Sequence, residues 1–324
     1  MNRQKSAIAI MMVICIVISY FGFVLDVNAQ TYYDVYEDYI EIESQEIQTN
    51  KKKVYRIKNF DDNRSVSERN VQKGLSQNDV QKRERYSGAN VGYIVGDDDR
   101  NEITNTTRTP YRYIGQLVST FKRKNNTTFN AYTTAFLVGE SIILTCAHGV
   151  YRKDGTLISA YFYPAQNGYD KRIYKYKCST VHVPSNYKTA IANKDKISED
   201  KYDYSVIQLT ESAGTKLGYF SLGGCNTSYN DSFIIGKSCT LVGYPGEKDG
   251  RMYRQKGKII KFNSQKYLMY YSMDSTNGQS GSPIIYPTSS GEYYVVGIHL
   301  GAEKPYNCAR YITNNISELV KKWR

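Results

Sequence analysis

The sequence has little of what metal centres and disulfide-stapled domains are built from. Its 324 residues include three histidines and six cysteines. They contain no Cys-x-x-Cys pair and no Cys/His spacing typical of a zinc site. We therefore expect no zinc or other metal at such a site, and we expect no cofactor. Calcium binding stays open. The sequence also lacks an internal repeat and the alternation of strands with long helices that a parallel sheet requires.

The cysteines do not define a disulfide framework. Cys15 falls in an apolar run at the N-terminus, and five others follow it: Cys146, Cys178, Cys225, Cys239 and Cys308. Because five is odd, at least one thiol is unpaired or pairs between chains. The most economical bridge joins Cys225 to Cys239, and the remaining pairings stay open.

One stretch of the sequence is apolar enough to cross a membrane, and it lies at the N-terminus. A basic start at residues 2–5 precedes an apolar run over residues 7–25 and a small-residue end at residues 27–29. This order predicts a signal peptide over residues 1–29 and a secreted protein with no membrane attachment after cleavage. The run is also close to the roughly 17–25 residues that span a bilayer, so an uncleaved anchor at the cell surface is the alternative.

Residues 30–92 differ in composition from the rest of the chain. An acidic, tyrosine-rich start gives way to a basic, polar stretch, and few apolar residues recur at any period. Such a segment cannot bury enough apolar surface to build its own core. Its place between a signal and a compact domain favours a pro-segment, largely disordered, that an activating protease removes. We expect the mature chain to start between Ala89 and Tyr93.

Residues 93–324 have a suitable length for one all-β domain, and short β-type runs punctuated by turn residues recur along them. The runs are 135–138, 141–145, 205–209, 239–242, 258–262, 267–271, 283–286 and 293–298. One clear helix is predicted over about residues 314–323, where Ile316, Leu319, Val320 and Trp323 fall on one face.

Positive charge exceeds negative charge in the sequence, with 43 Lys and Arg against 31 Asp and Glu. No basic–aromatic motif of a nucleic-acid-binding fold accompanies the excess, so we expect no nucleic-acid partner. A solvated basic surface with mild attraction for acidic polypeptides is the simpler interpretation. We expect a monomer whose partners are protein or peptide substrates.

Three motifs carry the chemistry, in the chain order His148, Asp203 and Ser280. His148 follows a buried strand, Asp203 enters another strand, and Ser280 lies among small residues. A serine nucleophile needs a base within reach, a residue that orients the base, and backbone N–H groups directed at the developing oxyanion. The amides of Gly278 and Ser280 supply the last if the loop curls. The order His, Asp, Ser is that of the chymotrypsin-like double six-stranded β-barrel, which we predict here.

Further stretches of the sequence resemble one particular family of chymotrypsin-like proteases. Residues 94–100 (IVGDDDR), 243–246 (GYPG) and 297–299 (GIH) are similar to stretches of the bacterial glutamyl endopeptidases, and the resemblance extends over residues 93–324. It implies a zymogen that cleaves after Glu, and less well after Asp. It also implies that His299 and Ser275 bind the substrate carboxylate, helped by the freed α-amino group of the mature chain.

Gln279 departs from the pattern of trypsin-like enzymes, and Asp274 leaves an alternative substrate specificity open. Gln279 stands where trypsin-like enzymes carry an aspartate that pairs with the new N-terminus, so that ion pair cannot be the activating switch. Asp274 stands where the same enzymes bind Lys or Arg, so a basic-specific protease is one alternative. A non-catalytic or narrowly specific binding relative is another. The remaining histidine, His182, matches no motif, and we expect it to be structural or at the surface.

Overall fold

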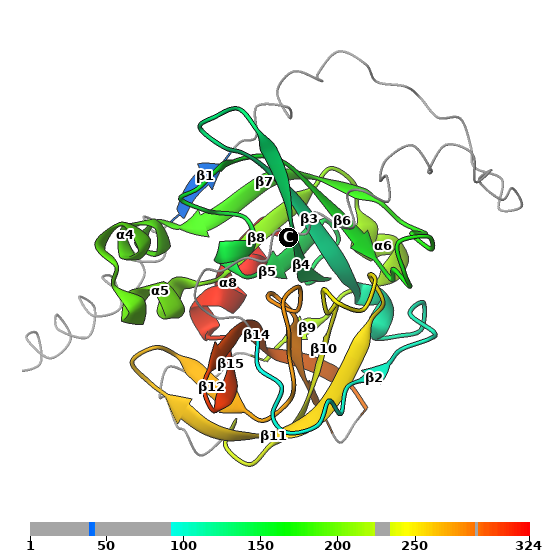
Figure 1. Cartoon of the computed structure of the whole chain (residues 1–324). Coiled ribbons are helices and arrows are strands. Elements are labelled where there is room, and N and C mark those ends of the chain that lie inside the picture. The colour runs from blue at the N-terminus through cyan, green and yellow to red at the C-terminus, as the bar shows by residue number, and fades with distance from the viewer. Residues whose placement is uncertain (1–38, 43–91, 224–233, 289–290) are drawn as a thin grey trace, which may run out of the picture.

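The structure is a computed structural model that describes residues 39–42, 92–223, 234–288 and 291–324. The predicted signal peptide and most of the predicted pro-segment lie outside these described residues. The body of the chain forms two antiparallel β-barrels, drawn in Figure 1 with the first in green and the second in yellow to red-brown. The predicted all-β double barrel is confirmed.

The first barrel is a sheet of six strands closed on itself. Its order is β7-β6-β3-β4-β5-β8, and β8 pairs back with β7. The strands are β3 (Ile114–Lys122), β4 (Thr128–Leu137), β5 (Ile142–Thr145), β6 (Thr156–Pro164), β7 (Tyr176–Pro184) and β8 (Ser205–Leu209). Closure satisfies the backbone hydrogen bonds that an open sheet would expose at its edges.

The second barrel is closed in the same way. Its order is β10-β13-β14-β15-β12-β11, and β11 pairs back with β10. The strands are β10 (Ser238–Gly243), β11 (Tyr253–Asn263), β12 (Leu268–Tyr271), β13 (Pro283–Pro287), β14 (Tyr293–Glu303) and β15 (Tyr306–Tyr311).

Three short strands extend the barrels. β1 (Tyr39–Ile42) pairs antiparallel with β7, β2 (Asn101–Glu102) pairs antiparallel with β11, and β9 (Ser221–Leu222) pairs parallel with β14. β1 belongs to the predicted pro-segment, so four residues of that segment form a strand rather than disordered chain. β2 fixes the end of the N-terminal stretch that crosses the second barrel.

Some strands have one face inside their own barrel and the other face against the second barrel. Such strands are apolar on both faces. In β5, Ile143 packs inside the first barrel, whereas Ile142 and Leu144 enter a separate core between the barrels. All four residues of β5 are buried. This placement explains why the sequence shows a continuous apolar run here instead of the alternation typical of a half-exposed strand.

Helix α8 (Asn314–Trp323) ends the chain, as predicted from the spacing of its apolar residues. Ile316, Leu319 and Val320 are buried in the core between the barrels. Burying each such side chain contributes roughly 1.5–3 kcal/mol. Thr313 occupies the N-cap position, and two lysines in the last turn suit the negative helix end.

Short helices that the apolar pattern does not predict interrupt the strands. They are α4 (Ser185–Asn193), α5 (Lys196–Tyr202) and α6 (Ala213–Leu217), with single 3-10 turns η2 (Tyr111–Tyr113) and η3 (Ala147–Gly149). Each spans too few turns to show a clear apolar period. α5 begins where Asp195 accepts hydrogen bonds from the amides of Ile197 and Ser198 at 3.1 and 3.2 Å.

The described cysteines are free thiols, and all four are buried: Cys146, Cys178, Cys239 and Cys308. The expected disulfide between Cys225 and Cys239 is therefore wrong, because Cys239 lies in the core of the second barrel. Burial raises the pKa of its thiol to about 12. Cys225 lies outside the described residues.

Among the helices in the described ranges, none combines the length and the apolar character needed to cross a bilayer.

Candidate active site

Strand pairing brings His148 and Asp203 together. β5 and β8 run antiparallel with Thr145 opposite Ser205, so the end of one strand meets the start of the other. His148 follows β5 on the turn η3, and Asp203 precedes β8 at the end of α5. Residues 55 positions apart in the sequence thereby become neighbours.

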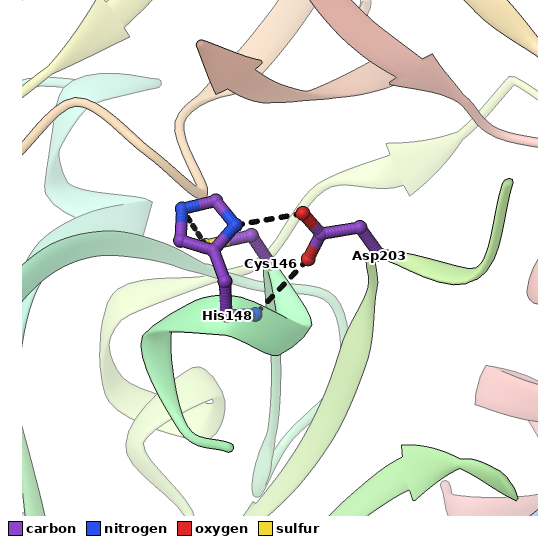
Figure 2. A group of neighbouring side chains, drawn as sticks. All are labelled: Cys146, His148 and Asp203. Carbon is purple, nitrogen blue, oxygen red and sulfur yellow. Dashed lines mark hydrogen bonds and ion pairs between the residues drawn. The ribbon is translucent and has the colours of Figure 1, made fainter. Parts of the chain in front are cut away.

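The Asp203 carboxylate holds His148 through both of its oxygens. Oδ2 lies 2.7 Å from Nδ1 of the ring, and Oδ1 accepts the backbone N–H of His148 at 3.0 Å (Figure 2). Burial alone would disfavour the imidazolium ion. The interactions of the ring with the Asp203 carboxylate, and secondarily with Cys146, outweigh burial and raise the pKa of His148 well above its usual value.

The other ring nitrogen of His148 faces a thiol. Nε2 lies 3.5 Å from Sγ of Cys146, and Cys146 is buried. The ligand atoms of Cys146, His148 and Asp203 lie within 4.8 Å of one another, as in some metal sites. However, the sulfur and the carboxylate contact opposite nitrogens of one ring (Figure 2), and these diverge. The arrangement orients the imidazole rather than enclosing an ion.

The serine loop is fastened to the same end of the first barrel. Thr134 of β4 donates its backbone N–H to the Ser280 carbonyl at 2.8 Å and its hydroxyl to the Gly278 carbonyl at 3.0 Å. Gly281 has a φ of +85°, and a Cβ there would lie 2.3 Å from Oγ1 of Thr145. A glycine is required at this position to let the loop approach the end of β5.

The hydroxyl of Ser280 donates to the Leu300 carbonyl at 3.1 Å. In the described residues, Oγ of Ser280 therefore makes this bond and none to Nε2 of His148. Such hydrogen bonds are often loose in the absence of substrate.

Two amides of the serine loop are left without acceptors. The N–H of Gln279 donates to the Thr276 carbonyl at 3.2 Å, and that of Gly281 donates to the His299 carbonyl at 2.7 Å. In contrast, the N–H groups of Gly278 and Ser280 have no hydrogen-bond acceptor among the described residues. Unpaired amides beside a serine are what an oxyanion hole requires.

A family model described as a trypsin-like peptidase domain matches residues 133–298, which are 166 of the 324 residues. The chain belongs to the trypsin-like peptidases. The match runs from β4 of the first barrel to β14 of the second and includes His148, Asp203 and Ser280. As its relatives bear out, the peptidase is a serine endopeptidase.

The peptidase is similar to several curated proteins. It is 29% identical over 260 residues to a glutamyl endopeptidase of Bacillus licheniformis, covering 75% of this chain and 74% of the relative. It is 29% identical over 234 residues to a Bacillus subtilis protein named extracellular metalloprotease, covering 71% and 69%. A solved Glu endopeptidase in complex with MPD matches with a TM-score of 0.58 and 22% identity, over 71% of this chain and 99% of that one. The structural likeness shows the double-barrel fold.

A buried histidine beside the serine loop, His299, has one ring nitrogen without a hydrogen-bond partner among the described residues. His299 of β14 donates its backbone N–H to the Ser282 carbonyl at 2.8 Å. Nδ1 of its ring lies 2.6 Å from the hydroxyl of Tyr271, and Nε2 has no partner among the described residues. Burial, and secondarily the charge of His148, lower the pKa of His299 to about 3. The ring is therefore neutral near pH 7.

Ser275 lies against the predicted start of the mature chain. Its hydroxyl donates to Oδ1 of Asn307 at 2.9 Å, and its backbone N–H donates to the Tyr93 carbonyl at 3.3 Å. Gly92 approaches so closely that a Cβ there would lie 2.1 Å from Oγ of Ser275. The residue expected to help bind substrate thus contacts the segment expected to carry the new N-terminus.

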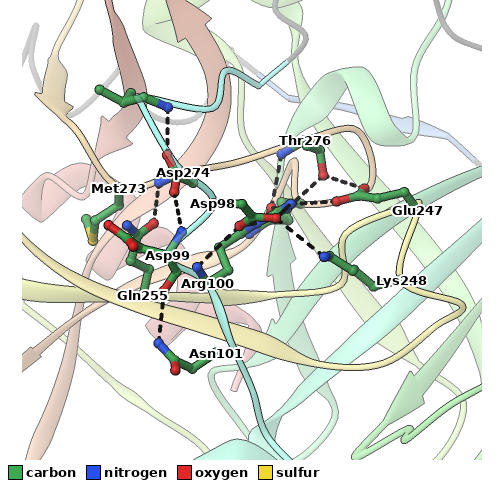
Figure 3. Close-up of polar contacts among 12 residues, drawn as sticks. Asp98, Asp99, Arg100, Asn101, Glu247, Lys248, Gln255, Met273, Asp274 and Thr276 are labelled. Atoms are coloured by element: carbon green, nitrogen blue, oxygen red, sulfur yellow. Dashed lines mark hydrogen bonds and ion pairs between the residues drawn. The ribbon is translucent and has the colours of Figure 1, made fainter.

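Asp274 is the third residue expected to contact substrate. The residue is 1% exposed. Its two oxygens accept the backbone N–H groups of Val95 at 2.7 Å and Asp99 at 3.0 Å (Figure 3). The carboxylate is thus engaged by the peptidase's own N-terminal stretch.

Three further side chains shape the site and carry no signal in the sequence. Asn307 accepts the Tyr93 N–H at 2.8 Å and donates to the carbonyls of Tyr93 and Met273. Tyr271 contacts His299, and Arg100 contacts Gln279. Arg100 is part of the stretch that resembles the glutamyl endopeptidases, but that resemblance gives it no role. The third histidine, His182, is buried against Trp323 with ring centroids 4.0 Å apart, in line with a structural residue.

Proposed function

We propose that the protein is a secreted serine endopeptidase, made with a pro-segment, that hydrolyses peptide bonds after Glu and less well after Asp. Ser280 attacks the scissile carbonyl, and His148 accepts its proton and then gives a proton to the leaving amine. Asp203 holds the His148 ring and stabilises its charged form. Water hydrolyses the acyl-enzyme, and no cofactor takes part.

The geometry around His148 supports this mechanism. The Asp203 carboxylate at 2.7 Å from Nδ1 keeps the proton on that nitrogen and leaves Nε2 to act as the base. The unpaired amides of Gly278 and Ser280 are available to bind the oxyanion. A barrel used only for binding would need none of these features, which argues against the non-catalytic alternative.

The preference for Glu rests on one observation, the unpaired Nε2 of the buried His299. Burying a polar nitrogen without a partner costs free energy, and an incoming acceptor removes that cost. With Nδ1 accepting from the Tyr271 hydroxyl, Nε2 carries the proton and donates to a carboxylate. A bound carboxylate would also raise the pKa of His299 from about 3 and add a charge-assisted bond.

A preference for Lys or Arg is disfavoured by the placement of Asp274. A buried carboxylate that already accepts two backbone N–H groups has little capacity left for a substrate cation. We assign Asp274 to holding residues 95–99. Ser275 and the freed α-amino group, near Gly92 and Tyr93, would complete the carboxylate site.

Secretion and activation are supported by the order of the sequence. The signal expected over residues 1–29 and the pro-segment over residues 30–92 precede the barrels. Residues 92 and 93 lie against Ser275, where a newly freed terminus could contribute to binding. An N-terminal sequence of the protein purified from culture supernatant tests this: a start between Ala89 and Tyr93 supports the proposal, and a product confined to membranes contradicts secretion.

The central experiment is a cleavage-site profile on a mixed peptide library, with Ser280→Ala as the control. Cuts after Glu that vanish in the control support the whole proposal. Cuts after Lys or Arg retain the serine mechanism but reject the assignment of Asp274. If the folded, correctly trimmed protein makes no cuts, the binding-only alternative is favoured.

A further inference from the structure

A buried arginine connects the N-terminal stretch to the serine loop. Residues 93–100, which we call the N-terminal strap, precede β2 and cross the second barrel (Figure 3). Asn307 holds the strap at Tyr93, and Asp274 holds it at Val95 and Asp99. The strap is thus fixed at its start and middle before it reaches Arg100.

Arg100 ends the strap with every donor of its guanidinium in use. The side chain is 2% exposed. Nε and one N–H of Nη2 donate to Asp98, and the other N–H of Nη2 donates to Glu247 at 2.6 Å. Nη1 donates to Oγ1 of Thr276 at 2.9 Å and to Oε1 of Gln279 at 2.8 Å. A fork of five donors fits such a set of acceptors, and a lysine could not reproduce it.

Through Gln279, Arg100 fixes the turn that leads to Ser280. Oε1 of Gln279 also accepts the backbone N–H of Thr276 at 3.0 Å, so the side chain closes the turn over residues 276–279. The guanidinium binds both ends of this turn, at Thr276 and Gln279. Since Asp98 and Glu247 balance its charge, a neutral amide oxygen is a suitable acceptor at position 279. This contact stands where related enzymes use a buried ion pair.

Through Glu247, Arg100 also sets the direction of the Gly278 amide. Glu247 follows Gly246, whose N–H donates to the Asn277 carbonyl at 2.5 Å. The C=O and N–H of a trans peptide point in opposite directions. Fixing the Asn277 carbonyl on Gly246 therefore turns the Gly278 N–H the other way, away from residues 244–246. A Cβ on Gly278 would lie 2.6 Å from the Tyr244 carbonyl, so the fit is close.

We propose that Arg100 is a positioning residue for the oxyanion hole, acting on the Gly278 amide through Gln279 and Glu247. The inference rests on the proposed function, since it assumes that this amide stabilises a tetrahedral intermediate. Losing one oxyanion donor typically costs about 10²–10³ in kcat. A displaced donor costs less, so we expect a loss of about 10–100-fold when Arg100 is replaced.

The test compares Arg100→Gln and Arg100→Lys with Arg251→Gln in the matured enzyme. Arg251 is a control because its contact with Glu102, at 3.4 Å, lies on the surface. For a peptide that the wild type cleaves, we expect Arg100→Gln to lower kcat about 10–100-fold with KM within about threefold. The rate at which a fluorophosphonate labels Ser280 should fall by the same factor. Arg100→Lys should lie between, and Arg251→Gln should leave both rates unchanged.

A purely structural role would give a different pattern. It would lower the melting temperature or raise KM while kcat and the labelling rate of the folded fraction stayed at the wild-type level, and that result overturns the proposal. Combining Arg100→Gln with Gln279→Ala should cost no more than the worse single change, because both act on one turn. Full additivity also overturns it. If Arg100→Gln does not fold, the half-exposed Glu247 allows a milder change, and Glu247→Gln must lower kcat several-fold.

The labelling experiment separates this inference from the proposed function. A wild type that resists the fluorophosphonate contradicts the serine mechanism itself. Equal labelling of wild type and Arg100→Gln leaves the mechanism standing and rejects the role of Arg100.

Discussion

The two barrels each contribute a histidine whose pKa is shifted, and the two shifts have opposite signs. His148 belongs to the first barrel, and its pKa is raised well above the usual value. His299 belongs to the second barrel, and its pKa is lowered to about 3. Burial disfavours the charged ring in both cases. The neighbour at Nδ1 differs: His148 has a carboxylate at 2.7 Å, and His299 has a tyrosine hydroxyl at 2.6 Å.

The neighbour at Nδ1 therefore decides which chemistry each ring suits. A carboxylate stabilises the imidazolium, so His148 can accept a proton during a reaction. A neutral hydroxyl provides no such stabilisation, so His299 stays uncharged until an anion approaches. Each prediction below changes one side of this comparison.

The largest effect is expected from Asp203→Asn. An amide cannot stabilise the imidazolium and favours the wrong tautomer, so kcat should fall about 10⁴-fold. The pKa of His148 should fall as well, since its main stabilising charge is gone. Steady-state kinetics and NMR titration of the His148 ring measure the two effects. The surface change Asp154→Asn is the control. Unchanged kcat would mean that this pair is not catalytic.

A smaller loss should follow His299→Gln. For a substrate with Glu before the scissile bond, kcat/KM should fall about 10²-fold, because a charge-assisted bond to the carboxylate is lost. The matched Gln substrate should be affected little, so the preference for Glu over Gln should collapse. His182→Gln removes a buried histidine elsewhere and should leave that preference intact. A preference that survives in His299→Gln would place carboxylate recognition on other residues.

Much of the fold could be predicted from local patterns. The apolar spacing of residues 316–323 predicts α8, and the turn signals between β-type runs predict an all-β domain. Strands β3 and β7 escape this approach because they bury polar residues, which break the apolar pattern of a core strand. Gln116, Ser119 and His182 are among them. The helix α5 depends on the Asp195 cap rather than on an apolar face.

The residues of the candidate site also differ in whether local sequence predicts them. His148, Asp203 and Ser280 could be predicted because each sits in a recognisable local context and their order is informative. Asn307, Tyr271 and Arg100 act through contacts with residues 28 to 214 positions away. No local pattern encodes such contacts. The wrong disulfide has the same cause, since whether Cys239 faces the core of the second barrel depends on strand register.

The third histidine extends the comparison to stability. Burial lowers the pKa of His182 to about 4, against about 6.5 in an unfolded chain. The folded state therefore takes up this proton less readily, and stability present above pH 6.5 is lost as the pH falls toward 4. We expect the loss linked to His182 to be about 2 kcal/mol at pH 4.5, after allowance for relaxation around the ring.

Urea unfolding at pH 7 and pH 4.5 measures this loss, in a Ser280→Ala background that prevents self-digestion. His182→Phe keeps an aromatic ring next to Trp323 but cannot titrate. Its loss of stability between the two pH values should be smaller than the parent's by about 2 kcal/mol. His299 contributes equally to both proteins, so it cancels. An identical loss in the two proteins would show that His182 is protonated as readily folded as unfolded.

The smallest effect is expected from Tyr271→Phe, which removes a single hydroxyl from the neighbour of His299. Without that donor, Nδ1 loses the partner that keeps the proton on Nε2, and a share of the rings presents the wrong tautomer to the substrate. We expect kcat/KM for the Glu substrate to fall about tenfold, roughly 1.4 kcal/mol, while the Gln substrate is unaffected. In combination with His299→Gln, the tyrosine change should have no further effect, because its only route to the substrate is through that ring. If the tyrosine change still lowers kcat/KM in the double variant, Tyr271 acts through the barrel core and not through His299. The Tyr271 hydroxyl would then not orient His299 as the Asp203 carboxylate orients His148.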